Sequence, residues 1–313
     1  MKALLFLMAN LSFMLLSCGG NSNKSPDDSP TSGVIAIAAD ASFAPIIDEE
    51  IAVFESLYPG TGIIPRYSGE TETVNALLKD SVWMGIAARP LSPGEKEYLN
   101  SKKLFPKEIR IAVDAIALIT NRSNPDSIIG IPTLKDILTG KTQTWRELSK
   151  DNSAGRIEVV FDHPNSSTVR YAIDSICGTT PLSIHLQAEQ NSQSVIDYVA
   201  KTPGALGIIG ANWIGSSSDT TRLSFSDKIR VMRVSRFKEA DRSNSFLPYQ
   251  AYIALGEYPM LRNVYILLSE PRTGLASGFT TFIASDRGQR IILKSGLLPA
   301  TQPIRLVNVR DEL

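Results

Sequence analysis

Three loops of the sequence carry hydroxyl groups or glycine where a helix is expected to begin. They lie at Ser42, at Ser68 and Gly69, and over Ser166 to Thr168. Free backbone N–H groups and the positive end of the dipole at a helix N-terminus favour a negatively charged ligand, and hydroxyls add donors. Serine, threonine and glycine are also ordinary helix caps, so one such loop alone indicates only a cap. The three loops together favour an oxyanion site.

Two arginines are placed to reach such a site. Arg89 directly follows an apolar strand, and Arg170 lies one turn into the helix after the third loop. A guanidinium can bind an oxyanion through two parallel hydrogen bonds. Each arginine could instead form an internal ion pair with Asp40, Asp162 or Glu70, and the residue pattern leaves both roles open.

The sequence offers little for catalysis or metal binding. It contains no Gly-x-Ser-x-Gly elbow, no HExxH motif and no Walker loop. His163 lies beside the third loop, but a polar loop histidine is usually only solvated. With two histidines, two cysteines and no Cys/His cluster, a zinc site is not indicated. We therefore expect no enzyme activity, no cofactor and no metal.

The composition is that of a soluble globular protein with room for two domains. The chain has 313 residues, with 32 Lys and Arg against 32 Asp and Glu, and 43% of its residues are hydrophobic. This hydrophobic content excludes a disordered chain. Zero net charge and the absence of a polybasic run argue against nucleic-acid binding.

The first 17 residues have the pattern of a secretory signal peptide. Lys2 precedes an apolar run to Leu16, which is shorter than the roughly 20 residues that a spanning helix needs. The residues before Cys18 resemble the bacterial lipobox, which implies cleavage before Cys18 and lipid on that residue. A secreted protein with an incidental cysteine is the alternative. Residues 18–32 should form a flexible tether to a bacterial membrane, with the folded part facing the periplasm or exterior.

From Gly33 onward, short β-branched runs alternate with helical patterns. A strand at residues 34–38 precedes a helix whose apolar residues follow a 3.6-residue period up to Leu57. This alternation predicts an α/β fold with largely parallel sheets. Residues 109–121 should form a long crossing strand, after which the strand–loop–helix pattern returns in a second lobe. Residues 250–255 should form a late strand that returns to the first lobe.

Several segments resemble the periplasmic phosphate-binding proteins of phosphate ABC transporters, which have the class II periplasmic binding protein fold. The similar segments extend over most of Gly33 to Pro299. They are Ala41-Ser42-Phe43-Ala44-Pro45, Ile86-Ala87-Ala88-Arg89-Pro90, Asn165-Ser166-Ser167-Thr168, Thr202-Pro203-Gly204-Ala205-Leu206-Gly207, Gly256-Glu257-Tyr258-Pro259 and Gly288-Gln289.

The resemblance implies a monomeric, two-lobed α/β protein with crossing hinge strands. Lobe 1 would comprise residues 33–118 and 245–313, and lobe 2 residues 119–244. The residues implied to hold the ligand are Ser42, Phe43, Ser68 and Gly69 from lobe 1 and Ser166, Ser167 and Thr168 from lobe 2. Arg89 and Arg170 could supply the positive charge.

Three positions depart from the family pattern. By this comparison, Trp83 replaces the aspartate that accepts the phosphate proton, and Asp162 replaces the arginine that pairs with phosphate. Glu70 also stands where the family has a small, uncharged residue. We expect a lipid-anchored protein that binds phosphate or a related oxyanion and delivers it to the permease of an ABC importer. The alternative is an envelope interaction or sensing lipoprotein with the same fold that no longer binds phosphate.

Overall fold

The computed structural model describes residues 28–183, 186–215 and 224–301. The predicted signal peptide, Cys18 and most of the predicted tether lie outside these residues. Within the described ranges, no helix is both long enough and apolar enough to cross a membrane.

The end of the predicted tether lies on the folded protein. The Asp28 carboxylate accepts a hydrogen bond, at 3.0 Å, from the first backbone N–H of helix α10 (Leu275–Ala284). Ser29 and Ser32 form a short antiparallel bridge. Because a carboxylate at a helix N-terminus satisfies a free N–H group and the helix dipole, this contact orders the chain before Gly33.

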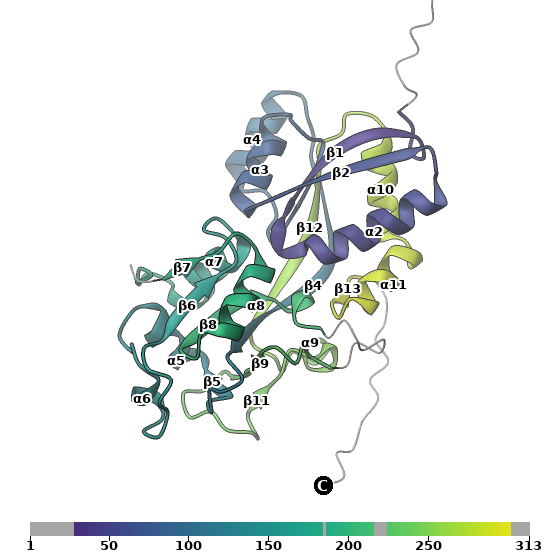
Figure 1. Cartoon of the computed structure of the whole chain (residues 1–313). Coiled ribbons are helices and arrows are strands. Elements are labelled where there is room, and N and C mark those ends of the chain that lie inside the picture. Colours follow the sequence, from purple (N-terminus) through teal and green to yellow (C-terminus); the bar gives the residue numbers. More distant parts are fainter. Residues whose placement is uncertain (1–27, 184–185, 216–223, 302–313) are drawn as a thin grey trace, which may run out of the picture.

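Strands and helices alternate in lobe 1, as the sequence predicts. The strands form a sheet, and the helices lie on both of its faces (Figure 1). Its elements are β1 (Gly33–Asp40), the 3₁₀ turn η1 (Ala41–Phe43), α2 (Ala44–Leu57), β2 (Thr61–Ser68), α3 (Glu70–Leu78), β3 (Met84–Ala87), α4 (Pro93–Ser101), β12 (Leu261–Leu268), α10, α11 (Asp286–Lys294) and β13 (Leu298–Pro299).

Lobe 2 repeats this pattern around a second part of the sheet. Its elements are β5 (Ile128–Gly130), α5 (Ile131–Leu138), α6 (Trp145–Leu148), β6 (Glu158–Phe161), α7 (Ser167–Tyr171), the π-helical turn η2 (Ala172–Cys177), β7 (Gln187–Ala188), α8 (Ser192–Lys201), β8 (Ala205–Gly210), the 3₁₀ turn η3 (Ala211–Trp213), β9 (Arg230–Val231), β10 (Arg233–Ser235), β11 (Ser245–Phe246) and α9 (Gln250–Ala254).

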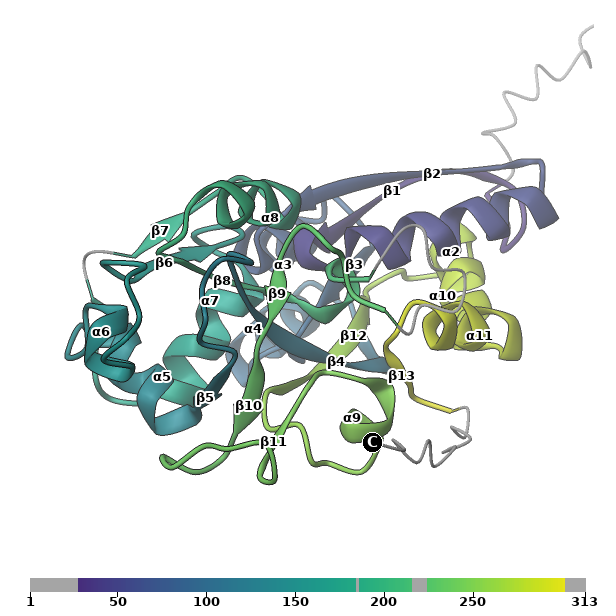
Figure 2. The ribbon, with the colours of Figure 1, turned by 60° about the horizontal axis from the view of Figure 1, so that its bottom comes forward.

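Strand β4 (Lys107–Thr120) joins the two lobes, as expected for a crossing strand (Figures 1 and 2). The order in the main sheet is β2-β1-β3-β12-β4-β8-β6-β7. Up to Ala115, β4 pairs with β12, and from Ile116 it pairs with β8. This change of partner lies just before residue 118, where the sequence predicts the boundary between the lobes. That lobe boundary stays a prediction.

Each lobe has its own hydrophobic core. Helix α2 buries the predicted stripe, including Ile47 and Phe54, in the lobe 1 core together with residues of α10. The lobe 2 core contains residues of β6, β8 and α5, and also Ile253 and Tyr258. We infer that the chain returns to lobe 1 at β12, later than residue 245.

The predicted late strand at residues 250–255 is wrong, because these residues form helix α9. A short apolar run cannot be assigned to a strand or a helix from periodicity alone. Here the Gln250 side chain donates hydrogen bonds to two carbonyl oxygens, of Leu293 and Leu297, each at 2.6 Å. The returning strand is β12, seven residues later in the chain at Leu261, and it is antiparallel to both β3 and β4.

Candidate functional site

The three predicted loops lie at the carboxyl ends of β1, β2 and β6. Ligand crevices of α/β proteins form at this position because the helix N-termini that follow the strands converge there. The loops after β1 and β6 come from different lobes and meet directly: Ser42 Oγ lies 3.4 Å from Ser167 Oγ. Both residues are buried.

The Ser42 turn is held from both lobes. Asp40 caps η1, and its Oδ1 accepts the Ser42 N–H at 2.8 Å. The Ser42 carbonyl oxygen accepts hydrogen bonds from Asn212 Nδ2 at 3.0 Å and from Trp213 Nε1 at 2.8 Å, both on η3 of lobe 2. These bonds fix the backbone of Ser42, whose hydroxyl lies next to that of Ser167.

The third loop is ordered by its own hydroxyls and by two aspartates. Ser166 caps α7, and its Oγ lies 2.7 Å from Thr168 Oγ1. The Thr168 hydroxyl donates to Asp162 Oδ1. The Ser167 N–H donates across the lobes to Asp40 Oδ2 at 2.8 Å. Asp40 therefore binds the N–H groups of both Ser42 and Ser167, the kind of donors that we expected to bind an external oxyanion.

The positive charge at this site comes from Arg262, which the sequence analysis did not identify. Arg262 lies on β12 with its side chain only 3% exposed. Its Nη1 donates to Ser167 Oγ at 2.5 Å, and its Nη2 to Ser42 Oγ at 3.1 Å. Nε and Nη2 both donate to Asp114 Oδ2, at 2.9 and 2.7 Å. The guanidinium carbon lies 4.7 Å from the centre of the Phe43 ring, within the range of a cation–π contact.

Three buried carboxylates surround this one guanidinium. Burial raises the pKa of Asp162, and the negative charge of Asp40 raises it further, while the Thr168 hydroxyl lowers it. Burial also raises the pKa of Asp114, against the opposing effect of Arg262. Burial alone would lower the pKa of Arg262, but the charges of Asp114 and Asp40 outweigh it and raise that pKa. Protonation of an aspartate would make the cluster more favourable for an anion.

Arg89 and Arg170 form the internal ion pairs that the sequence left open, both involving Glu70. Arg89 Nη1 lies 2.7 Å from Glu95, and its Nε lies 4.0 Å from Glu70. Hydrogen bonding to Arg89 lowers the pKa of Glu95 to about 2. Arg170 Nε and Nη2 both donate to Glu70. The hydrogen bonds of these arginines therefore go to acids and backbone, whereas those of Arg262 reach the serine hydroxyls.

The remaining predicted residues lie close to the site or support it. Ser68 Oγ lies 3.4 Å from Thr73 Oγ1 at the start of α3. Gly69 caps α3, and Phe43 packs under Arg262. Trp83 precedes β3 at the end opposite the site, so it does not occupy a ligand position. Asp162, in contrast, lies within the cluster.

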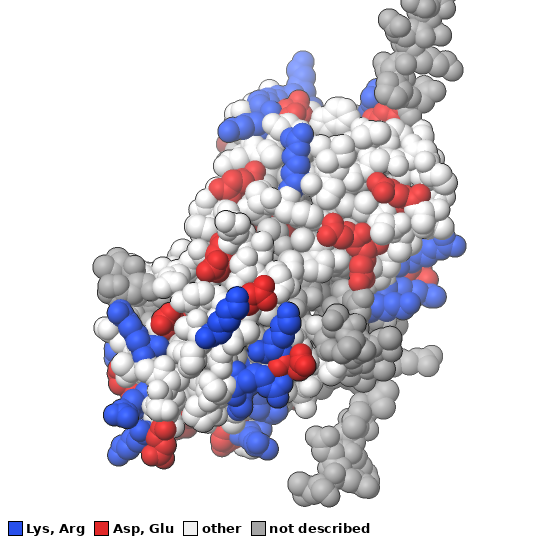
Figure 3. Space-filling model, viewed as in Figure 1, with Lys and Arg blue, Asp and Glu red and all other residues white. Residues whose placement is uncertain are grey.

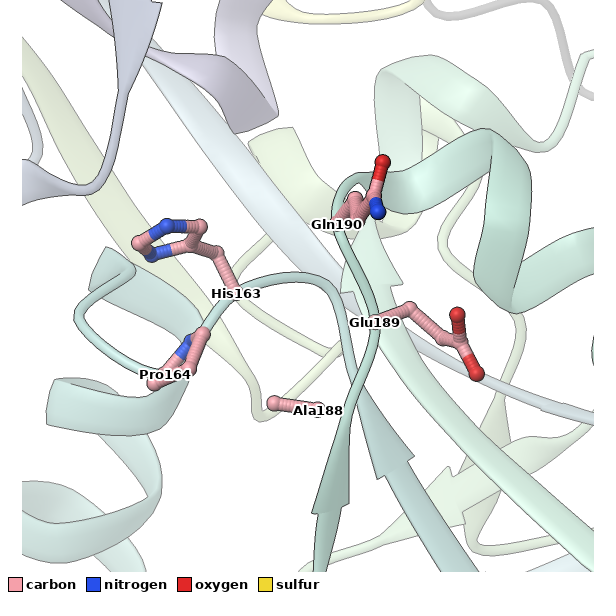
Figure 4. A pocket seen from close by; sticks show the side chains of 5 residues that line it. All are labelled: His163, Pro164, Ala188, Glu189 and Gln190. Carbon is pink, nitrogen blue, oxygen red and sulfur yellow. The ribbon is translucent and has the colours of Figure 1, made fainter.

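One face of the molecule carries surface charges of both signs. On the face shown in Figure 3, basic and acidic residues are interspersed over both lobes. A hollow of about 520 Å³ lies beside the third loop, lined by His163, Pro164, Ala188, Glu189 and Gln190. The side chains of His163 and Glu189 point in different directions (Figure 4), so they do not form a common ligand set. Among the described residues, no group of three potential ligands could hold a metal ion.

Comparisons with known proteins identify the same fold and related sequences. A family model described as PBP superfamily domain matches residues 24–287. The phosphate-binding protein PstS of Bacillus subtilis is 25% identical over 313 residues, covering 95% of this chain and 93% of the relative. PstS of Staphylococcus epidermidis is 22% identical and covers 89% and 82%.

Solved structures of other proteins superimpose on this fold. A structure with bound phosphate from Clostridium perfringens, described as a phosphate ABC transporter substrate-binding protein, superimposes with a TM-score of 0.71 at 24% identity. It covers 85% of this chain and 99% of its own. A phosphate receptor from Vibrio cholerae has a TM-score of 0.63 at 18% identity, covering 85% and 100%. At these identities the structural similarity establishes the two-lobed fold.

Proposed function

Because this chain belongs to the PBP superfamily, we propose that it binds phosphate or a related oxyanion between its lobes and delivers it to an ABC importer. The observation that supports this most is the convergence of the Ser42 hydroxyl, the Ser167 hydroxyl and the Arg262 guanidinium at the carboxyl ends of strands from both lobes. Hydroxyl and guanidinium donors suit an anion, and a site shared by two lobes encloses its ligand when they close. The relatives that are named as phosphate-binding proteins support the same ligand.

The proposed ligand residues follow from this geometry. Ser42 and Ser167 would donate their hydroxyls, and Arg262 would supply the charge that we had expected from Arg89 or Arg170. Ser166 and Thr168 would hold the third loop in place through Asp162. Phe43, Ser68 and Gly69 stay predicted site residues, as supports of the loops that face the ligand.

The place of the protein in the cell is part of this proposal. We propose that signal peptidase cleaves before Cys18, that lipid on Cys18 anchors the protein to a bacterial membrane, and that the lobes lie outside the cytoplasm. The protein would act as a monomer and carry the ligand without chemical change. The hydrogen bond from the Leu275 N–H of α10 to Asp28 supports a tether that leaves the folded protein beside lobe 1.

One observation favours the alternative function in envelope interaction or sensing. Asp40 already accepts the N–H groups of Ser42 and Ser167, and the cluster holds three carboxylates against one guanidinium. This excess of carboxylates over guanidinium groups would repel an oxyanion, and the fold would then serve a role without phosphate. The alternative therefore predicts no phosphate binding at any pH at which the protein is folded.

Calorimetric titration with inorganic phosphate separates the two functions. The protein is first stripped of ligand by unfolding and refolding. We expect micromolar or tighter binding, and we expect Ser167→Ala to weaken it by about tenfold, because one hydrogen bond to a charged ligand contributes about 1.5 kcal/mol. The matched control is Ser56→Ala, which removes an exposed hydroxyl that bonds only the Val53 carbonyl within α2. Absence of heat with phosphate, arsenate and sulfate would favour the alternative.

A further inference from the structure

The two lobes meet a second time beside the serine cluster. We name this contact the α3 seam: it joins residues 70–72 of α3 in lobe 1 to residues 165–170 of lobe 2. The Thr71 N–H donates to the Asn165 carbonyl oxygen at 3.4 Å. The Asn165 side-chain amide donates to Glu72 Oε1 at 2.5 Å. The Arg170 guanidinium donates twice to Glu70.

Glu70 is the acid of the ion pair, and it is held on lobe 1. Its side chain is 4% exposed, and its Oε1 accepts the Ala88 N–H at 2.7 Å. The Ala88 bond holds the carboxylate on lobe 1, just after β3. A buried carboxylate without a cationic partner is costly, so Glu70 is strongly favoured to keep one. Arg89 lies 4.0 Å away in the same lobe but forms its hydrogen bonds to Glu95 and Pro90.

Arg170 is the base of the ion pair, and it moves with lobe 2. It lies on α7, the helix whose first residue is Ser167, so the same rigid element carries a proposed ligand hydroxyl and the guanidinium. Its Nη2 lies 3.2 Å from Glu70 Oε1, and its Nη1 lies 3.5 Å from Asp174 one turn further along. When the lobes part, the Glu70 contacts must break, whereas the Asp174 contact stays within lobe 2.

The backbone of the α3 seam is shaped for close approach. A Cβ on Gly69 would lie 2.7 Å from the Asn165 carbonyl oxygen and 2.8 Å from His163 Nδ1. The same Cβ would lie 2.5 Å from Glu72 Oε2 of lobe 1, the end of a side chain that can move, so the contact that would have to give is the one with the Asn165 backbone of lobe 2. The seam is therefore a fitted contact between the lobes and includes one partly buried ion pair.

We propose that the Glu70–Arg170 ion pair is a latch that holds the lobes closed over the ligand and sets the rate at which the ligand leaves. This inference rests on the proposed function. The unliganded protein exchanges between an open form, which the ligand enters, and a closed form, which the pair stabilises. At least about half of the unliganded molecules are open, so loss of the pair raises the association rate by less than about twofold. Dissociation requires the lobes to open, so loss of the pair speeds dissociation. Glu70 and Arg170 are thus positioning residues that act through closure.

The test compares dissociation with association. The probe is inorganic phosphate, and both rates are measured by stopped-flow fluorescence with the intrinsic tryptophans. We expect Glu70→Gln and Arg170→Gln each to raise the dissociation rate about tenfold, or ~1.4 kcal/mol, with the association rate changed less than about twofold. The double variant should be no faster than either single variant, because both remove the same pair. The control is Asp174→Asn, which removes the other partner of Arg170 and should leave both rates unchanged.

A second measurement works without ligand. Small-angle scattering of the unliganded protein should give a larger radius of gyration for Glu70→Gln and Arg170→Gln than for the unchanged protein and Asp174→Asn. If phosphate does not bind the unchanged protein, the proposed function fails while this comparison still tests the latch. Equal radii for all four proteins would overturn the latch. So would a slower association with an unchanged dissociation rate, because Arg170 would then attract the ligand rather than hold the lobes.

Discussion

Glu50 is a buried acid whose protonation should make the stability of this protein depend on pH. It lies on α2 in lobe 1 and is fully buried, and neither carboxyl oxygen has a hydrogen-bond partner among the described residues. Burial, with a smaller contribution from the charge of Glu49, raises the pKa of Glu50 from 4.5 to about 9. The folded protein therefore holds a proton on Glu50 that the unfolded chain releases at neutral pH.

The sign and size of the effect follow from linkage. Because the folded pKa is raised, the stabilising contribution is fully present below pH 4.5 and is lost as the pH rises toward and through 9. Each pH unit in this window costs about 1.4 kcal/mol, so at pH 7 the loss is about 3 kcal/mol. Glu50→Gln keeps the size of the side chain and cannot ionise. The variant should therefore become more stable than the unchanged protein as the pH rises.

Urea unfolding at several pH values between 5.5 and 8.5 measures this difference. The free energy of unfolding of Glu50→Gln minus that of the unchanged protein should grow by about 1.4 kcal/mol per pH unit. The control is Glu97→Gln, since Glu97 is an exposed acid on α4. Parallel pH profiles for Glu50→Gln and the unchanged protein would refute the reasoning, because they would show that Glu50 has similar pKa values folded and unfolded.

Two further predictions concern the ligand site. Gly69→Ala should weaken phosphate binding by at least about tenfold in calorimetry and leave the urea midpoint unchanged. The reason is that its Cβ would lie 2.7 Å from the Asn165 carbonyl oxygen only when the lobes are closed. Unchanged affinity would show that the lobes need not approach this closely. Asp162→Asn should flatten the pH dependence of phosphate affinity, since burial and Asp40 raise the pKa of Asp162 and its protonation should favour the anion. Parallel slopes in the two proteins would exclude Asp162 as the titrating group.

The main features of the fold could be predicted from the sequence because local patterns carry them. The period of Ile46, Ile47 and Phe54 identifies α2, and the alternation of strands and helices predicts the α/β class. The loops at Ser42 and Ser166 each follow a strand, β1 and β6. These two strands run in opposite directions in lobes that share β4, so their carboxyl ends face each other between the lobes. Residues 250–255 were assigned wrongly because a short apolar run lacks such a period.

Arg262 was missed because its role depends on a contact far away in the sequence. It lies 148 residues from Asp114 and reaches it only because β12 pairs with β4, with Arg262 opposite Asp114. A single acid inside the apolar run 109–121 was the available signal, since a buried carboxylate that stays ionised needs a cationic partner. The sequence could not identify which arginine that is. For Arg89 and Arg170 it did name Glu70 among the possible partners, and the structure confirms that pairing for both.

The most direct test of the proposed site is a crystal structure of the stripped protein after addition of phosphate. We predict one phosphate between the lobes, with its oxygens within hydrogen-bond distance of Ser42 Oγ, Ser167 Oγ and the Arg262 guanidinium, and with Arg170 still paired to Glu70. A phosphate bound instead by Arg89 or Arg170, away from Arg262, would contradict the proposed site.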